Sequence, residues 1–356
     1  MFQGERYAYR LYMPSGPAVL TPGEAASDDR AADEAPASTP AIPATPAVEG
    51  GPRAPLLVLL HGCKQDAADF AAGTGMNALA AEQGCMVLYP EQLTSSNSMR
   101  CWNWFEAAHQ ARGQGEPAMI AALTLKVLKR HPVDPARVYI AGLSAGGAMA
   151  TMVAALYPEM FTGVGVHSGL PRGAANDVMS AFRAMRQGAR QSIAGKKDGG
   201  ADGVMPTIVF HGSADKTVHP DNGDLIVKAA LAAVEASGRP LRKSQRTLKG
   251  ARGAEDRSAT RTVYKGRDGL SYVEYWAVGA GPHAWSGGQT AGSYTDPAGP
   301  SASQAMLRFF LQHRKPAHPP PLPLQDETSA DAGEPEDGLP NDSGPQRMDA
   351  SNASSE

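Results

Sequence analysis

The sequence predicts an α/β fold in which helices cover both faces of a mainly parallel sheet, built as a single domain. Two observations predict it. Short apolar runs alternate along the chain with longer segments in which apolar residues recur at helical spacing. Several of these runs are apolar at nearly every position, which is typical of strands buried on both faces. In such a sheet the strand ends are the first place to look for a site.

The expected elements follow in order along the chain. A first strand-like piece, "RYAYRLYMP", stands near the N-terminus. Further strands are expected at the β-rich apolar runs, which are "LLVLLHG", "CMVLYP", "VYIAG", "GVGVHSG", "TIVFHGSAD", "RTVYKG" and "YVEYWAV". Helices are expected at the segments with helical periodicity, which lie within 67–83, within 116–130, directly after residue 144, near 224–235 and at 301–313.

Composition excludes several classes of protein. The chain has 356 residues, of which 42% are hydrophobic and 19% charged, with a formal net charge of -3, as in an ordinary globular protein without a nucleic-acid partner. No apolar run reaches the roughly 18 residues that span a bilayer, and the start "MFQGERYAYRLYMP" lacks a signal-peptide pattern. No cysteine or histidine cluster has metal-ligand spacing, so we expect no metal and no cofactor.

A serine between two glycines is the first candidate for chemistry. Gly142, Ser144 and Gly146 form a G-x-S-x-G segment between the apolar run 138–141 and the helix-like "AMATMVAALY". A sharp strand-to-helix turn that exposes a nucleophile needs this context and these small neighbours. An ordinary turn is the alternative, because glycine and serine are common turn residues.

Two further strand ends supply partners for this serine. Asp215 follows the run "TIVFHG", and His283 follows "YVEYWAV". The order Ser144, Asp215, His283 is that of an α/β-hydrolase, in which histidine takes the serine proton and the carboxylate orients the imidazole. A turn or helix-cap role for Asp215 and a loop role for His283 are the alternatives. His219 competes as the base only if His283 is misassigned.

An acyl-transfer site also needs donors for the oxyanion of the tetrahedral intermediate. The backbone N–H of Ala145, directly after the nucleophile, is one candidate. We assign the second donor to Cys63, in the "LLHGCKQ" turn that ends the first long apolar strand. A plain strand-ending turn is the alternative for this segment.

Low-complexity segments divide the chain. Residues 1–16 hold the first strand or strands, and 17–54 form an inserted loop rich in Pro, Ala and Ser. Residues 55–315 form the α/β-hydrolase catalytic domain, and 316–356 form an acidic, Pro-rich tail that we expect to be disordered. The stretch 188–203 is expected to be a mobile linker.

Seven segments in the same order resemble the polyhydroxybutyrate depolymerase family of serine esterases. They cover about residues 6–315 and read "RLYMPSG", "LLHGCKQ", "YPEQ", "CWNWF", "RVYIAGLSAGGAMA", "FHGSADKTVHP" and "GPHAWSGG". Because the His-Gly-Cys segment precedes the serine, the chain resembles the unpermuted type of catalytic domain. The resemblance implies hydrolysis of short-chain polyhydroxyalkanoate, its oligomers or related esters through an acyl-Ser144 intermediate. It also implies an extracellular or periplasmic location, with a cytoplasmic one as the alternative.

Two other functions remain open. Feruloyl and acetylxylan esterases share the fold and motifs but cleave acyl groups from plant polysaccharide. A non-catalytic polyester-granule binding protein would keep the cleft and lose a triad residue, and the intact triad argues against it. The oligomeric state is not predicted.

Several aromatic and histidine residues lie near the strand ends. Trp102, Trp104 and Trp285 are candidates to line a cleft for an ester chain, and core packing is the alternative. His61 and His167 are expected to be structural.

The basic run "RPLRKSQRTLKGAR" is expected to be a solvated connection.

The three cysteines bear on the compartment. Cys63 lies at the oxyanion turn and Cys101 opens a loop after the next strand, so both are expected near the same rim of the sheet. We predict a Cys63–Cys101 disulfide that holds the donor N–H in position, and two reduced thiols are the alternative. Cys85 begins an apolar strand and is expected to be a buried free thiol.

Overall fold

The fold is seen in a computed structural model that describes residues 7–14, 53–190, 204–249 and 257–316. The predicted inserted loop (17–54), the linker (188–203) and the tail (316–356) lie almost entirely outside the described residues. The described residues belong to one compact unit, in agreement with the predicted single domain.

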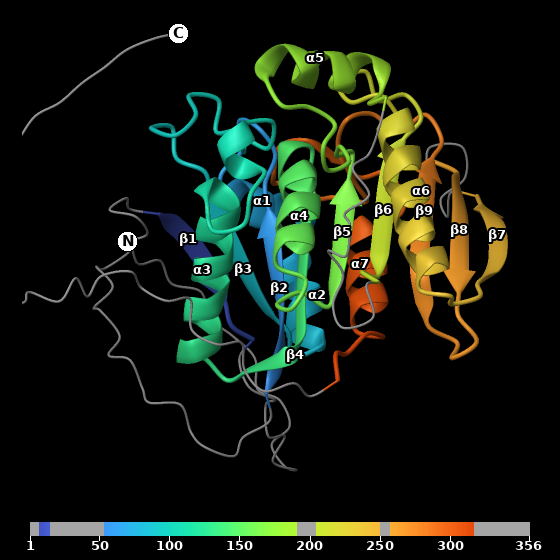
Figure 1. The fold of residues 1–356 in the computed structure, drawn as a ribbon, viewed down its shortest axis with the longest axis horizontal. Helices are drawn as coiled ribbons and strands as arrows, with labels where there is room; N and C mark the ends of the chain where they lie inside the picture. The colour runs from blue at the N-terminus through green and yellow to red at the C-terminus, as the bar shows by residue number, and fades with distance from the viewer. Residues whose placement is uncertain (1–6, 15–52, 191–203, 250–256, 317–356) are drawn as a thin grey trace, which may run out of the picture. The chain divides into compact units, whose positions relative to one another are not determined.

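A nine-stranded sheet runs through the described part of the chain (Figure 1). Its spatial order is β1-β3-β2-β4-β5-β6-β9-β8-β7. The six strands from β3 to β9 in this order are parallel, whereas β1 at one edge and β8 and β7 at the other pair antiparallel. The bounds are β1 Ala8–Tyr12, β2 Ala54–Leu60, β3 Met86–Glu91, β4 Val133–Leu143, β5 Gly163–His167, β6 Thr207–Gly212, β7 Arg242–Leu248, β8 Ala259–Lys265 and β9 Ser271–Val278. The predicted mainly parallel sheet is confirmed.

Helices cover both faces of the sheet, as predicted (Figure 1). One face carries α3 (Gly115–Arg130), α4 (Ala145–Leu156) and α6 (Asp221–Ala236). The other carries α1 (Ala67–Thr74), α2 (Met76–Glu82) and α7 (Ala302–Phe310). A short helix η1 (Ala107–His109), a helix α5 (Val178–Gln187) and the small strand pair β10 (Trp285–Ser286) and β11 (Thr295–Asp296) complete the described elements.

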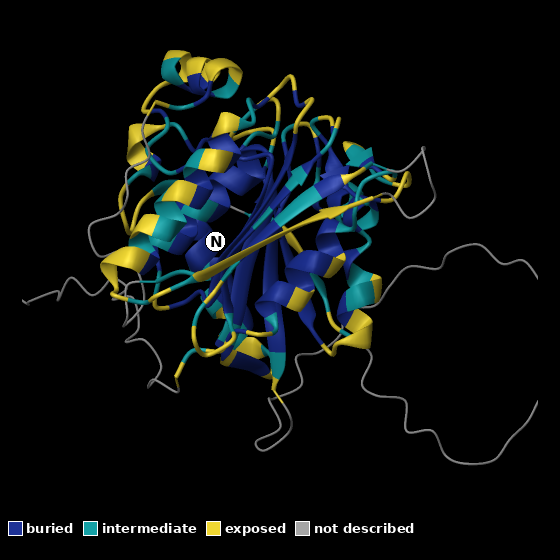
Figure 2. Cartoon of the chain, turned by 90° about the vertical axis from the view of Figure 1, so that its right-hand side faces the viewer, coloured by how far each residue is buried: buried dark blue, intermediate teal, exposed yellow. Residues whose placement is uncertain are grey.

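Two hydrophobic cores lie between these layers. Along β2, Leu56, Val58 and Leu60 pack into the core beneath α3 and α4, and Leu57 and Leu59 pack into the core beneath α1 and α7. Successive side chains of a strand point to opposite faces, so a strand buried on both faces must be apolar throughout. Figure 2 shows these central strands as the buried middle of the protein.

Three of the longer elements differ from the sequence prediction. The single helix expected within 67–83 is two helices, because Gly75 between them has a left-handed φ of 59°. The basic run expected to be a solvated connection contains strand β7, which pairs with β8 along its whole length although all its side chains are exposed. Helix α5 was not predicted, and only Ala181 and Ala184 in it are buried.

Candidate active site

Ser144 lies at the sharp turn between strand β4 and helix α4. Its backbone has φ 57° and ψ -120°, a conformation that a non-glycine residue keeps only where its surroundings hold it. A Cβ atom built on Gly142 would lie 2.4 Å from the carbonyl carbon of Gly146. A Cβ atom on Gly146 would lie 2.2 Å from the carbonyl oxygen of Leu60. The G-x-S-x-G segment therefore has the backbone geometry of a nucleophile elbow, and both glycines are required for it.

The structure brings the three predicted triad residues together. Ser144 follows β4, Asp215 follows β6 and His283 follows β9, all at the carboxyl ends of parallel strands. His283 Nε2 lies 2.9 Å from Ser144 Oγ, and His283 Nδ1 lies 2.8 Å from Asp215 Oδ2. An ionised carboxylate only accepts hydrogen bonds, so Nδ1 donates to Asp215 and Nε2 accepts from the serine hydroxyl. This arrangement joins a hydroxyl nucleophile to a base and an orienting acid.

Asp215 is a buried carboxyl group with donors at both of its oxygens. Its Oδ1 accepts from the backbone amides of Thr217 and Val218 at 2.9 Å and 2.8 Å. Burial alone raises the pKa of the carboxyl group, but hydrogen bonds from His211 and His283 outweigh burial and hold the Asp215 pKa well below its usual range. Asp215 is therefore ionised at neutral pH and is able to stabilise a positive charge on His283.

Two backbone amides beside the elbow have free donors. Ala145 is the first residue of α4, where the helix provides no acceptor for its N–H. Cys63 lies in the turn after β2, which is held by the hydrogen bond from the Lys64 amide to the Met99 carbonyl at 2.7 Å. Within the ranges that the structure describes, neither the Cys63 nor the Ala145 amide takes part in a hydrogen bond. Both remain candidate donors to an oxyanion.

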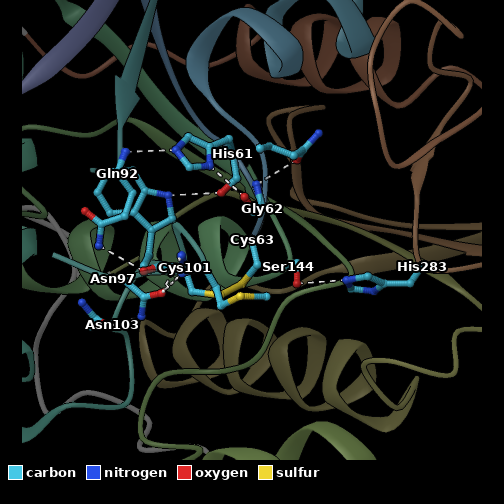
Figure 3. Close-up of a disulfide and its surroundings, with 12 residues drawn as sticks. His61, Gly62, Cys63, Gln92, Asn97, Cys101, Asn103, Ser144 and His283 are labelled. Atoms are coloured by element: carbon cyan, nitrogen blue, oxygen red, sulfur yellow. Dashed lines mark hydrogen bonds between the residues drawn. A yellow bond between two sulfur atoms is a disulfide. The ribbon is translucent and has the colours of Figure 1, made fainter. Parts of the chain in front are cut away.

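Cys63 and Cys101 form a disulfide, with their Cα atoms 4.2 Å apart (Figure 3). The bridge was predicted from the sequence and is confirmed. It joins the candidate oxyanion turn to the loop that carries Trp102. Cys85 is a buried free thiol, as predicted, and burial raises its pKa to about 12, which keeps the thiol protonated.

The described residues hold no group of three or more His, Cys, Asp or Glu placed to bind a metal ion. Among the same residues, no helix has both the length and the apolar character needed to cross a membrane. A groove of about 1020 Å³ between α2, α7 and β8 lies apart from the triad and is lined by residues such as Leu79, Arg261 and Arg308. Both arginines pair with the buried Glu274, so their charges are largely compensated.

Comparison with known families gives a clear result. The model of the family described as esterase PHB depolymerase matches residues 41–238, which is more than half of the chain. The chain belongs to this family.

Curated members and relatives of the PHB depolymerase family match parts of the chain. Poly(3-hydroxyalkanoate) depolymerase C of Paucimonas lemoignei is 42% identical over 176 residues, which are 48% of this chain and 42% of that protein. Poly(3-hydroxybutyrate) depolymerase of Ralstonia pickettii is 28% identical over 273 residues, 73% of this chain and 52% of that protein. Feruloyl esterase B of Neurospora crassa is 27% identical over 268 residues, 72% of this chain and 82% of that protein. The chain spans about half the length of the two depolymerases.

A solved structure supports the fold. An acetyl xylan esterase from Aspergillus awamori has a TM-score of 0.55 at 18% sequence identity, covering 72% of this chain and 89% of that chain. The predicted α/β-hydrolase fold is therefore confirmed for this member of the PHB depolymerase family.

The three tryptophans predicted as candidate substrate-binding residues are buried. Trp102, Trp104 and Trp285 expose 0%, 4% and 1% of their surface. Trp102 Nε1 donates to the His61 carbonyl at 3.1 Å, and Trp285 Nε1 donates to Ser303 Oγ at 2.9 Å. Trp102 and Trp104 pack in one core and Trp285 packs in the other. Burial of the Trp102 and Trp285 rings is compatible with their polar N–H groups because each of the two finds an internal acceptor. The cleft-lining prediction is corrected to core packing.

His167 is structural, as predicted. Its ring is stacked between those of Phe210 and Trp285, with centroid distances of 5.7 Å and 5.2 Å. His167 Nε2 accepts from the Ser286 amide at 2.9 Å, and complete burial lowers the His167 pKa to about 3. This neutral ring therefore fixes the chain three residues after His283.

His219 does not contact Ser144. Its side chain is 43% exposed and lies 3.5 Å from the Asp221 carboxylate. The rival assignment of His219 as the base therefore has no geometric support.

A buried polar network beneath the Cys101 loop was missed by the sequence analysis. Glu116 in α3 accepts from the backbone and side-chain amides of Asn103, both at 2.7 Å, and burial raises the Glu116 pKa. Gln92 donates from its side chain to the Cys101 carbonyl and from its backbone to His61 Nε2, both at 3.0 Å (Figure 3). The network links the candidate oxyanion turn to this loop. Its only sequence signal was the polar residues inside "YPEQ" and "CWNWF".

Proposed function

We propose that the chain hydrolyses short-chain polyhydroxyalkanoate, or its oligomers, through an acyl-Ser144 intermediate. The observation that carries this proposal is the continuous hydrogen-bonded chain from Ser144 through His283 to Asp215. A serine hydroxyl is a weak nucleophile at neutral pH, and this arrangement provides the base that it needs.

The proposed reaction has two steps. Ser144 Oγ attacks the ester carbonyl carbon while its proton passes to His283 Nε2. The oxyanion then lies at the amides of Cys63 and Ala145, and Asp215 stabilises the imidazolium. The alcohol leaves with the proton from His283. In the second step water attacks the acyl carbonyl carbon while its proton passes to His283, and the acid is released as that proton returns to Ser144 Oγ. No cofactor takes part in these steps.

Membership of the PHB depolymerase family supports a polyester substrate. The relative with 42% identity is itself named a poly(3-hydroxyalkanoate) depolymerase. Relatives named feruloyl esterase or acetylxylan esterase are 27% to 30% identical, so acyl groups on plant polysaccharide are the alternative substrate. The complete triad argues against a granule-binding protein without activity.

Helix α5 favours a large apolar substrate over a small soluble one. Val178, Met179 and Phe182 on this helix are between 51% and 74% exposed. The backbone of α5 is tied to the loop that carries Asp215, because the Met185 carbonyl accepts from the His219 amide at 2.7 Å. Helix α5, which carries these exposed apolar residues, lies at the end of the sheet where the triad strands end (Figure 1), so a polyester surface at the triad would meet this helix.

The disulfide supports a location outside the cytosol. Stable disulfides belong to oxidising compartments, and Cys63–Cys101 lies at the candidate oxyanion turn where its loss would disturb the site. We propose an extracellular or periplasmic location on this basis.

The test compares hydrolysis of p-nitrophenyl butyrate, soluble hydroxybutyrate oligomers, amorphous polyhydroxybutyrate and methyl ferulate by the purified chain. The proposal predicts turnover of the butyrate, the oligomers and the polymer, and its loss in Ser144→Ala. Turnover of methyl ferulate with none of the oligomers or the polymer favours the alternative. Full activity of folded Ser144→Ala contradicts the mechanism.

A second arm tests the contribution of α5. A variant with Val178→Ser, Met179→Ser and Phe182→Ser is expected to lose hydrolysis of the solid polymer and to keep that of p-nitrophenyl butyrate. Met13→Ser is the control, since Met13 is 53% exposed but lies after the edge strand β1. If the triple variant keeps the same fraction of wild-type activity on the solid polymer as on p-nitrophenyl butyrate, the result contradicts a role for α5.

A further inference from the structure

A second histidine faces the carboxylate of Asp215. His211 lies in strand β6, four residues before Asp215, and its ring is buried. His211 Nε2 lies 2.9 Å from the Val218 carbonyl oxygen and 3.5 Å from Asp215 Oδ2. The ring is therefore placed between the carboxylate and the backbone of the loop that holds it.

The hydrogen-bond partners fix which nitrogen of His211 carries the proton. Nε2 faces two acceptors, the Val218 carbonyl and the Asp215 carboxylate. Nδ1 is buried and has no hydrogen-bond partner in the part of the chain that the structure describes. A hydrogen on Nε2 satisfies both acceptors, whereas a hydrogen on Nδ1 would satisfy none. The Nε2–H form is therefore the one that fits the site.

Helix α6 holds the ring in this position. A Cβ atom built on Gly223 would lie 2.9 Å from His211 Nδ1 and 3.1 Å from His211 Cβ. The helix backbone thus packs directly against the ring because residue 223 has no side chain. On this side the helix backbone restricts rotation of the imidazole away from Asp215.

With His211 in place, the four acceptor positions of the Asp215 carboxylate are nearly filled. Oδ1 accepts from Thr217 and Val218, and Oδ2 accepts from His283 at 2.8 Å and faces His211 at the longer distance. The same His211 N–H donates to the carbonyl of Val218, and the amide of Val218 in turn donates to Asp215 Oδ1. His211 therefore completes a set of contacts that restrains the orientation of the carboxylate.

We propose that His211 is a positioning residue of the triad, which shares its Nε2–H between Val218 and Asp215 and thereby directs Oδ2 at His283. The inference rests on the proposed ester hydrolysis. It adds a residue outside the triad. If the Asp215 carboxylate is misaligned, His283 spends less time in the geometry for proton transfer. A purely structural role, limited to the bond with the Val218 carbonyl, would leave catalysis unchanged once the protein is folded.

The test uses two substitutions of His211. His211→Leu removes the donor and keeps much of the volume, while His211→Gln places an amide N–H near the position of Nε2. In His211→Leu we expect kcat for p-nitrophenyl butyrate to fall about 10- to 100-fold, the effect of losing a hydrogen bond to a charged group, with KM unchanged. His211→Gln is expected to recover most of kcat.

A matched control is available in the same chain. His313 is also buried, and its Nε2 lies 2.9 Å from the Ser271 carbonyl oxygen, but it contacts no triad residue. His313→Leu and His313→Gln are expected to change the midpoint of thermal unfolding and to leave kcat of the folded protein unaltered. A loss of kcat in His313→Leu as large as in His211→Leu overturns the inference.

A spectroscopic measurement tests the inference apart from activity. The proton shared by His283 Nδ1 and Asp215 gives a low-field resonance in the proton NMR spectrum. We expect this resonance to shift or broaden in His211→Leu and to remain in both His313 variants. If the wild type hydrolyses no ester, the proposed function fails, and the resonance still decides whether His211 positions Asp215.

A third substitution guards against misfolding of His211→Leu. Gly223→Ala leaves every polar group in place but pushes a methyl group against the His211 ring, and it is expected to lower kcat and shift the same resonance. Wild-type kcat and an unchanged resonance in folded His211→Leu, or in folded Gly223→Ala, overturn the inference.

Discussion

Gly146 lies directly against the carbonyl oxygen of Leu60, with 2.2 Å between that oxygen and any Cβ atom added to the glycine. A backbone carbonyl does not move aside as a flexible side chain does, so the contact requires glycine. It allows the start of helix α4 to meet the end of strand β2. Ser144 and the turn of Cys63 are brought to the same edge of the sheet by this contact.

Gly146→Ala is therefore expected to damage both folding and catalysis. Overpacking of this kind lowers the free energy of unfolding by about 1–3 kcal/mol, and the displaced elbow lowers kcat as well. Urea denaturation and p-nitrophenyl butyrate hydrolysis measure the two effects. Gly84→Ala is the control, because Gly84 has a φ of 59° but no atom near its missing side chain, so it should cost stability alone. Wild-type stability and kcat in Gly146→Ala would show that the close contact is unimportant.

The central strands and the triad were predictable from the sequence for one physical reason. A strand buried on both faces is apolar at nearly every position, as β2 is and as the middle of β6 is, so a polar residue such as Asp215 soon after β6 stands out. The glycines around Ser144 likewise indicate a close approach of strand and helix backbones, which few structures other than a nucleophile elbow require.

The elements that were missed carry no such signal. All side chains of β7 are exposed, so its pairing with β8 leaves no apolar pattern in the sequence. The prediction that the tryptophans line a cleft was wrong for a different reason. An indole ring suits a cleft and a core equally well, so its presence in the sequence does not distinguish the two, whereas the partner of its N–H does. For Trp285 that partner is Ser303, which no local pattern indicates.

Asp215→Asn is expected to lower kcat by about 10⁴, the scale of loss when the orienting carboxylate of a triad becomes an amide. The reason is that an amide at this position stabilises the wrong tautomer of His283. Asp221→Asn is the matched control, because Asp221 has a 64% exposed side chain and faces His219 instead. Steady-state kinetics of both variants give the comparison. A loss below tenfold in Asp215→Asn, or an equal loss in Asp221→Asn, would assign the orienting role elsewhere.

Loss of the disulfide is expected to affect stability and rate together. The bridge closes a sequence separation of 38 residues, so Cys101→Ala should lower the free energy of unfolding by about 2–4 kcal/mol. It should also lower kcat, because Cys63 carries a candidate oxyanion donor. Denaturation and kinetics with and without dithiothreitol check this. Reductant should lower the stability and kcat of the wild type to those of Cys101→Ala and leave that variant unaffected. A reductant effect of equal size in both proteins would refute the Cys63–Cys101 disulfide.

His167 makes the folded state sensitive to mild acid. Its pKa is about 3 in the folded protein and 6.5 in the unfolded chain, so the unfolded chain binds the proton first as the pH falls. The stability that depends on neutral His167 is therefore complete above pH 6.5 and is lost as the pH drops toward 3. Between pH 6.5 and pH 5 the loss is about 2 kcal/mol. Urea denaturation at both pH values should show a smaller loss in His167→Phe, and equal losses in variant and wild type would contradict the burial argument.

The central claim is that Ser144 is the nucleophile, and labelling with diethyl p-nitrophenyl phosphate followed by peptide mass spectrometry tests it most directly. This reagent phosphorylates an activated serine and leaves a slowly hydrolysed adduct. The account predicts one diethylphosphoryl group on Ser144, loss of p-nitrophenyl butyrate hydrolysis in proportion to the label, and no label in Ser144→Ala. A label on another residue of the active wild type, or full activity of completely labelled protein, would contradict it.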